Sequence, residues 1–354
     1  MRITGQFLRR PFFIKLFNRE YWSFGMVYTW IYPVWIFLSL RARSFFFFSA
    51  ANPSIANGGF LGESKKDIHN IMPSELYPRT RHFAKGTAAL TVLAILKENG
   101  FNFPLIGKPD MGGRGRGVKI LKNEQDVLLY AGAAQLDFHV QEFIDFPYEA
   151  GIFWYKYPDE KKGRISGIVR KEFLTVYGDG SSTMRELLQR ETRSLLQLGS
   201  LERMYGDELN TVLKKGEKKL LVPYGNHARG AKFLDDSHFA DEQLTETLNT
   251  ICERIQNFYF GRLDIRYKDW EELKRGRDFS VIEVNGAGAE PTHIYDPRHS
   301  LFFAWKEIIR HWIILWKVSR QNHRRGHRYL TVREGLRMFR EDKKNSKKLA
   351  LMPE

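Results

Sequence analysis

The pattern of apolar and polar positions along the chain predicts a mixture of strands and helices. Short apolar or alternating runs bounded by turn residues are typical of strands, and they occur at 103–108, 118–121, 140–144, 150–157, 261–267 and 279–285. Longer segments with helix-forming residues and helix start or stop signals occur at 64–71, 86–98, 123–136, 184–205, 241–258 and 301–318. Strands and helices interspersed in this way predict an α+β chain.

Several of the expected helices have a recognisable first residue. Ser64 is followed three positions later by Asp67, which is typical of a helix N-terminus, and Asn123 begins another helix. After the turn at Asp179 and Gly180, Ser182 is expected to cap the next helix. These caps fix where the expected helices begin.

Two aromatic segments leave more than one interpretation open. Residues 22–40 carry no charge and are long enough for a membrane span, but Pro33 lies in the middle, and Trp and Tyr prefer the bilayer interface. The segment is therefore an interfacial or re-entrant anchor, a buried element or a true span. Residues 301–318 predict an amphipathic helix with a wide apolar face, which fits either an anionic membrane surface or packing within the protein.

Composition limits the classes of function. The 354 residues are 43% hydrophobic, which argues against global disorder, and the net charge of +15 favours an anionic partner. Twelve Lys and Arg face three acids in residues 317–348, so the rest of the chain is only modestly basic and no nucleic-acid partner is expected. Cys252 is the single cysteine, which excludes an internal disulfide and fits a reducing compartment.

The segment 261–285 carries the first candidate chemistry. Residues i and i+2 of a strand share a face, so Glu283 and Asn285 point to one place, and Asp264 joins them if the two strands pair as a hairpin. Two carboxylates and an amide oxygen suit a hard cation such as Mg²⁺ carrying nucleotide phosphates. A hairpin with ordinary polar residues is the alternative.

A glycine-rich turn between two expected strands carries the second set of candidate functional residues. Lys108 ends the first strand and can place a point charge on a phosphate. The turn brings backbone amides close to an anion through Gly112, Gly113, Gly115 and Gly117. Because a strand rather than a helix follows, this is not a dinucleotide fingerprint. The segment predicts a flap over phosphates, or else a plain glycine hairpin.

These stretches together resemble the ATP-grasp superfamily, and most closely its carboxylate–amine ligases of the D-alanine–D-alanine ligase and cyanophycin synthetase type. The resemblance covers roughly residues 85–297. The motifs that carry it are IGKPDMGGRGRGV, VQEFIDFPYEAGIF, VYGDGSSTMRELL, YGNHARGAKFLD and FGRLDIR followed by FSVIEVNGAG. It implies an ATP-grasp fold, with two α+β lobes and the nucleotide between them.

The resemblance also assigns roles to residues. It places Lys108 on the α- and β-phosphates and the four glycines over the β- and γ-phosphates. It places Glu142 and Ile144 at adenine and Glu149 at ribose. It implies that Asp264, Glu283 and Asn285 hold two Mg²⁺ ions, for which Mn²⁺ can substitute, and that Arg262 stabilises the transferring phosphoryl group.

The sequence departs from the family pattern in three places. The family has a second phosphate-binding lysine well upstream, and here the candidate is Lys85, only 23 residues before Lys108. The turn after Asn285 is GAGAEP rather than Ser-Pro-Gly, so the acceptor pocket differs. Residues 1–84 do not look like the substrate-binding domain of these ligases.

The expected activity is ATP-dependent ligation of a small carboxylate to an amine through an acyl-phosphate, with release of ADP and phosphate. Lys171 is expected at the γ-phosphate and Arg229 as a carboxylate clamp, and a solvated strand lysine is the alternative for Lys171. An ATP-grasp phosphotransferase or a non-catalytic nucleotide-binding protein at the membrane surface is the alternative function.

The expected organisation has four parts. They are an aromatic-rich N-terminal region at 1–84, a small lobe with the phosphate loop at 85–147, a large lobe with the metal site at 148–300, and an amphipathic helix with a basic tail at 301–354. The two aromatic ends, together with the basic tail, predict a cytoplasmic protein that associates peripherally with the inner face of the membrane.

Overall fold

The computed structural model describes residues 11–113 and 115–352. These residues fall into two compact units. Unit 1 combines the N-terminal segment up to Tyr32 with Val169–Asp236 and Thr292–Glu307, and unit 2 combines Pro33–Ile168 with Ser237–Pro291 and the segment from Ile308 onward. Both contain helices and antiparallel strands, so the α+β class is confirmed.

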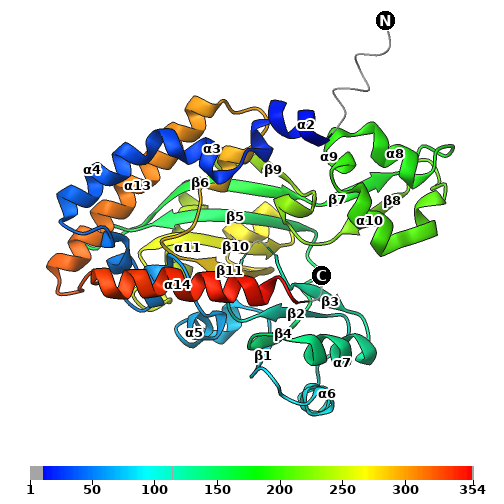
Figure 1. Cartoon of the computed structure of the whole chain (residues 1–354), viewed down its shortest axis with the longest axis horizontal. Helices are drawn as coiled ribbons and strands as arrows, with labels where there is room; N and C mark the ends of the chain where they lie inside the picture. The colour runs from blue at the N-terminus through cyan, green and yellow to red at the C-terminus, as the bar shows by residue number, and fades with distance from the viewer. Residues whose placement is uncertain (1–10, 114, 353–354) are drawn as a thin grey trace, which may run out of the picture. The chain divides into compact units, whose positions relative to one another are not determined.

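Unit 2 contains an antiparallel four-stranded sheet in the order β1-β4-β2-β3. Its strands are β1 (Thr80–Phe83), β2 (Leu105–Pro109), β3 (Lys119–Leu121) and β4 (Phe138–Glu142). Two helices, α6 (Ala89–Glu98) and α7 (Glu124–Ala133), pack apolar side chains on one face of this sheet (Figure 1). The expected glycine-rich turn joins β2 to β3, which pair directly.

A second sheet of unit 2 holds the expected hairpin. Its strands run in the order β11-β10-β5-β6, and they are β5 (Tyr148–Tyr155), the part of β6 (Arg164–Glu172) up to Ile168, β10 (Phe260–Tyr267) and β11 (Phe279–Asn285). Helices α5 (Lys65–Asn70) and α11 (Glu242–Glu253) share a buried apolar cluster with it. The segment between β10 and β11 contains the short helix α12 (Trp270–Lys274).

A third apolar cluster of unit 2 involves both aromatic segments. It joins α4 (Tyr32–Ala42) to the part of α13 (Leu301–Arg324) after Glu307, and to α14 (Val332–Leu349). Ile314, Leu315 and Val318 of α13 are at most 5% exposed. His311 of the same helix is buried, and its Nε2 lies 2.9 Å from Ser166 Oγ. The apolar face of this part of α13 therefore packs within the protein.

The structure also shows which elements residues 22–40 form. The segment forms α3 (Phe24–Tyr28), a 3-10 turn and α4. Within residues 11–113 and 115–352, no helix is long and apolar enough to cross a membrane. Leu38 of α4 is buried, whereas Ile36, Phe37 and Leu40 are exposed.

Replacement of Leu315 by Ala should lower the free energy of unfolding by about 2–5 kcal/mol, because a 1%-exposed leucine leaves a cavity when it is truncated. The matched control is Ile313→Ala, two positions earlier on the exposed side of α13, where the loss should be well below that range. Denaturant titration of both variants measures the difference. Equal, small losses would contradict the assignment of this face to the core.

Unit 1 has smaller sheets and short helices. β7 (Leu174–Tyr177) pairs with β8 (Lys218–Val222), and the end of β6 pairs with β9 (Lys232–Asp235). The helix expected at 184–205 is interrupted, and forms α8 (Met184–Arg190), α9 (Thr192–Leu195) and α10 (Leu198–Tyr205). Helix α2 (Pro11–Phe17) precedes α3.

The expected cap of α8 was wrong by one residue. Thr183 caps the helix in a reciprocal capping box with Glu186. Ser182 is instead bound by the turn before it, because its backbone N–H and its hydroxyl both donate to Asp179, at 2.7 and 2.8 Å. A short polar side chain next to an Asp-Gly turn satisfies that turn first.

Candidate functional site

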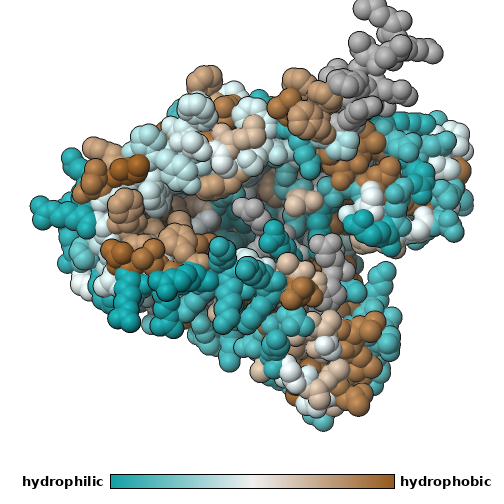
Figure 2. Space-filling model, viewed as in Figure 1, coloured by the Kyte–Doolittle hydropathy of each residue, from teal (hydrophilic) through white to brown (hydrophobic). Residues whose placement is uncertain are grey.

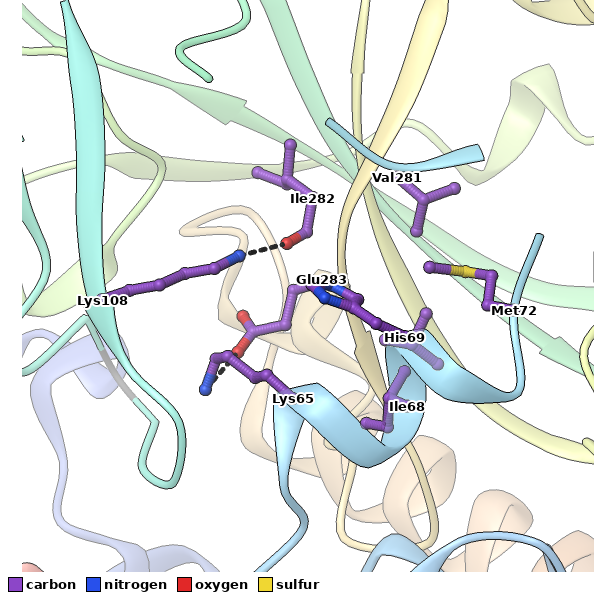
Figure 3. Close-up of a pocket in the computed structure, with 9 residues that line it drawn as sticks. Lys65, Ile68, His69, Met72, Lys108, Val281, Ile282 and Glu283 are labelled. Carbon is purple, nitrogen blue, oxygen red and sulfur yellow. Dashed lines mark hydrogen bonds and ion pairs between the residues drawn. The ribbon is translucent and has the colours of Figure 1, made fainter. Parts of the chain in front are cut away.

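A small pocket of unit 2 lies between α5, β2 and β11 (Figure 3). Its polar lining consists of Lys65 and His69 from α5, Lys108 from β2 and Glu283 from β11. Its apolar lining consists of Ile68, Met72, Val281, Ile282 and Val284. Two ammonium groups and a carboxylate thus meet apolar side chains in one concavity, an arrangement typical of ligand sites.

The ammonium group of Lys108 is held by one residue of β4 and one residue of β11. It donates to Gln141 Oε1 at 2.9 Å and to the Ile282 carbonyl at 3.3 Å. The side chain is 6% exposed. Burial, with a smaller contribution from the neighbouring positive charge of Lys65, lowers the pKa of Lys108 to about 7. An anion entering the pocket would favour the charged form.

Lys65 is a site residue that the sequence reasoning did not identify. It is the first residue of α5, directly after the Ser64 cap. Its ammonium donates to the Gly112 carbonyl at 2.9 Å and lies 3.7 Å from Glu283 Oε1. Lys65 therefore connects the glycine-rich turn to the acidic hairpin. The Ser64 cap was the signal in the sequence that could have identified Lys65, because the residue after a cap is the first residue of its helix.

Four polar side chains share one face of the hairpin formed by β10 and β11. In the register of this ladder Asp264 lies opposite Glu283 and Arg262 lies opposite Asn285, and opposed residues of an antiparallel pair point to the same side. A bulge follows Asp264. Arg262 Nε donates to Asp264 Oδ1 at 2.8 Å. The hairpin thus assembles the three expected cation ligands beside the expected arginine.

The charges of the neighbouring carboxylates affect the pKa of Arg262. Burial alone would lower the pKa of Arg262, but the nearby carboxylates of Asp264, Glu283 and Glu290 raise it. Asp264 is 3% exposed. The Nδ2 atom of Asn285 is excluded from solvent and has no hydrogen-bond partner among the described residues.

Glu63 is a second site residue that sequence reasoning missed. Its Oε2 atom is excluded from solvent and has no partner among residues 11–113 and 115–352. Burial is the main cause that raises the pKa of Glu63 to about 7, and Glu283 adds to it. An orphaned carboxylate oxygen beside Glu283 is what a divalent cation with oxygen ligands would relieve, so the residues present fit Mg²⁺.

The glycine-rich turn has the backbone that glycine permits. Gly112, Gly115 and Gly117 all have positive φ, and a Cβ atom at Gly112 would come within 2.6 Å of Leu349 Cδ1. The C-terminal helix α14 therefore packs against the turn, and Asn345 of that helix donates to Met111 Sδ at 3.1 Å. Gly113 has open space around its Cα.

Several residues expected at the nucleotide lie outside the lining of this pocket. Lys85 is exposed, and its ammonium donates to Gln135 at 3.3 Å. Glu142 forms an ion pair with Arg79 at 2.7 Å. Glu149 is 2% exposed and faces Arg266, with Oε2 3.2 Å from Nε. Ile144 follows β4 and is half-buried.

Lys171 and Arg229 belong to unit 1. Lys171 lies on β6, is 6% exposed and has its ammonium 6.0 Å from the centre of the Phe233 ring. Arg229 ends a 3-10 turn and donates to the Tyr224 hydroxyl at 2.6 Å.

Comparison with known proteins gives likenesses in structure. No family model and no curated protein matches the chain. A bifunctional glutathione synthetase from Pasteurella multocida matches with 17% identity and a TM-score of 0.38 over 66% of this chain and 33% of its own. The VanG D-Ala:D-Ser ligase from Enterococcus faecalis matches with 14% identity and a TM-score of 0.40 over 72% and 61%.

The D-alanine–D-alanine ligase from Bacillus anthracis matches with 14% identity and a TM-score of 0.37 over 72% of this chain and 68% of its own. The chain thus spans a third of the glutathione synthetase and less than two thirds of the VanG ligase. With TM-scores of at most 0.40 and identities of at most 17%, these three likenesses assign no activity to the chain. The likeness concerns the fold alone.

Proposed function

We propose that this protein is an ATP-dependent carboxylate–amine ligase of the ATP-grasp type. The observation that carries the proposal is the meeting of Lys65, Lys108 and Glu283 in one pocket beside the glycine-rich turn. Two cationic side chains suit a polyphosphate. The carboxylate and amide oxygens of the hairpin suit its cation.

We assign each residue of the site a role in the reaction. Lys65 and Lys108 bind phosphate oxygens, and Lys65 takes the place in the site that was expected for Lys85. Asp264, Glu283 and Asn285, joined by Glu63, would hold one or two Mg²⁺ ions, which offset developing charge on the phosphates. Arg262 stabilises charge on the transferring phosphoryl group, in a site where low solvent access makes that interaction strong.

The reaction has two balanced steps. An oxygen of the substrate carboxylate attacks the γ-phosphorus, the bond to ADP breaks, and an acyl-phosphate forms. An amine then attacks the acyl carbon, the bond from that carbon to the phosphate oxygen breaks, and inorganic phosphate leaves with one oxygen of the original carboxylate. The amine loses a proton to solvent. The roles expected for Lys171 at the γ-phosphate and for Arg229 as a carboxylate clamp stay predictions from the sequence.

The test is a matrix of small carboxylates and amines incubated with the full-length protein, ATP and Mg²⁺, with ADP release as the readout. A ligase releases ADP only when both substrates are present, and it passes one heavy-oxygen label from the carboxylate to phosphate. ADP release with a phosphorylated product and no amine requirement would favour a phosphotransferase. Nucleotide binding without turnover across the matrix would favour the non-catalytic alternative.

We also propose that α4 associates peripherally with an anionic membrane surface. Ile36, Phe37 and Leu40 are 47, 55 and 68% exposed, Arg41 follows them, and hydrophobic residues gather over α4 in Figure 2. Exposed apolar side chains beside basic ones suit such an interface.

The full-length protein should sediment with anionic liposomes at low salt, and the double variant Phe37→Ser, Leu40→Ser should sediment several-fold less. Leu90→Ser is the matched control, because Leu90 is 73% exposed on α6. A wild-type protein that stays in the supernatant would rule out this association.

A further inference from the structure

Three histidines of unit 2 come together from three separate elements. His82 on β1 and His139 on β4 lie directly opposite each other in the sheet, so their side chains point to the same face. His69 of α5 completes the group. One ring nitrogen from each of the three lies within 4.8 Å of the others, and the ring centres of His82 and His139 are 4.3 Å apart.

Each of these histidines has a buried nitrogen without a partner. The Nδ1 atoms of His69, His82 and His139 are all excluded from solvent, and none has a hydrogen-bond partner among the described residues. A buried polar atom without a partner is costly, and a bound water or ion is one explanation for such an atom in a native structure. Three unpartnered nitrogens on the three histidines of one cluster indicate a shared ligand.

The surroundings of His139 fix its tautomer. Its Nε2 lies 2.8 Å from Asp110 Oδ1, and an ionised carboxylate only accepts hydrogen bonds. Nε2 therefore carries the proton, and the lone pair is on Nδ1. Asp110 is itself held by Ser64 Oγ at 3.0 Å and by the Lys66 backbone N–H at 2.9 Å. A carboxylate behind a histidine is the usual support of a metal-bound imidazole.

The other two rings are also kept in place. His69 stacks on Tyr77 with ring centres 4.0 Å apart. His82 packs edge-on against His139, with an angle of 82° between the two ring planes. The neutral imidazole is the form that binds metals.

We propose that His69, His82 and His139 form a site for a transition-metal ion of the Zn²⁺ class. Nitrogen ligands select such an ion over Mg²⁺ or Ca²⁺, which take oxygen ligands. Bonds of about 2.0–2.1 Å in a tetrahedral geometry place the nitrogens roughly 3.3 Å apart, so the rings draw inward when the ion binds. Three protein ligands leave a fourth position for water or another ligand.

The ion would tie α5 to the four-stranded sheet. Lys65 and His69 lie on that one helix, and His69 also lines the pocket that contains Lys108. Positive charges near the histidines, above all Lys108 and Lys65, oppose a cation, whereas Asp110 favours it. The metal thus fixes the helix that carries Lys65, independently of the oxygen ligands proposed for Mg²⁺.

The test uses the full-length protein without nucleotide. After chelator treatment, titration with Zn²⁺ should show one tight site per chain, and Co²⁺ in its place should give the strong visible absorption of a tetrahedral site. His82→Asn should weaken the affinity at least 100-fold, because it removes a ligand. Asp110→Asn should weaken it by about 10- to 100-fold, because it removes the support of His139.

His238→Asn is the matched control, because His238 is exposed and lies outside the cluster, and it should leave the affinity unchanged. His82 is chosen because it is only half-buried, and circular dichroism verifies that the variant is folded. If a variant does not fold, X-ray absorption of the wild-type protein loaded with Zn²⁺ decides, since the site requires three imidazole ligands. No tight site, or a site indifferent to His82→Asn, would overturn the proposal.

Discussion

Replacement of Glu283 by Gln is expected to reduce Mg-ATP turnover by more than about 100-fold while the protein stays folded. The carboxylate lies opposite Asp264 in the hairpin and 3.7 Å from Lys65. Its side chain is 34% exposed, so it supports no core, and loss of an ion pair of this kind costs less than about 1 kcal/mol. Release of ADP measures the first effect and thermal denaturation the second.

The control is Glu246→Gln, which removes a carboxylate from an exposed ion pair with Lys162 on the surface of unit 2. It should leave both turnover and stability close to those of the wild type. Undiminished turnover in Glu283→Gln would remove Glu283 from the metal site.

The variant Asp264→Asn separates a loss of turnover from a loss of stability less well than Glu283→Gln does. Asp264 is 3% exposed and pairs with Arg262 at 2.8 Å. Breaking a buried pair by removing one partner costs about 3–5 kcal/mol, so this variant should lose stability as well as turnover. Replacement without cost to the fold is therefore expected for Glu283 alone.

The parts of the site that could be predicted are those set by local pattern. The alternation of polar residues in 261–267 places Arg262 and Asp264 on one face, and the Lys-Pro pair at the end of a strand singles out Lys108. Glu63 and Lys65 lie at the start of the expected helix at 64–71, where the Ser64 cap is a local signal for the helix but not for its contacts. Their contacts join residues far apart in the chain, and local propensity carries no information about such contacts.

The contact that Glu149 makes also could not be predicted from the local sequence. The family resemblance places this residue at ribose, and that role stays a prediction. In the structure it faces Arg266, which is its direct partner across the β5–β10 ladder. The register between two strands more than 100 residues apart is a tertiary property. The histidine cluster was hidden for the same reason, because positions 69, 82 and 139 show no metal-ligand spacing.

The apolar stripe of helix α13 is compatible with two environments, a membrane surface and a protein core. An apolar stripe on a helix is the same whether a membrane or a protein core covers it. The sequence therefore left both open, and the burial of Leu315 and Val318 decides for the part of α13 in unit 2. The buried His311, which contacts Ser166, shows that a polar residue can lie on the covered side when it finds a partner. In contrast, the polar side chains of α14 form an exposed hydrophilic band (Figure 2).

Binding of a nucleotide polyphosphate is expected to take up a proton above pH 7, with Lys108 as the group that gains it. Burial lowers the pKa of Lys108 to about 7 in the free protein, far below the ordinary lysine value of about 10.4. Bound phosphate favours the ammonium form and raises this pKa. The affinity should therefore be greatest below pH 7 and fall by up to about tenfold per pH unit above it.

The stability of the free protein should change in the opposite direction. Between pH 7 and the ordinary lysine range, the unfolded chain holds a proton on Lys108 that the native protein has lost. The unfolding free energy therefore rises with pH across this window. Calorimetry with Mg-ADP from pH 6 to 9, in buffers with different heats of ionisation, measures the proton uptake, and denaturant titration at the same pH values measures the stability.

Two variants isolate the group responsible. Lys108→Met should bind Mg-ADP more weakly at pH 6 and show no proton uptake at pH 8. Lys65→Met should retain the uptake but move it to higher pH, because the charge of Lys65 is one of the causes that lower the pKa of Lys108. A wild-type affinity that does not vary between pH 6 and 9 would mean that Lys108 does not contact the phosphates, because a buried ammonium facing that much negative charge cannot keep its pKa unchanged.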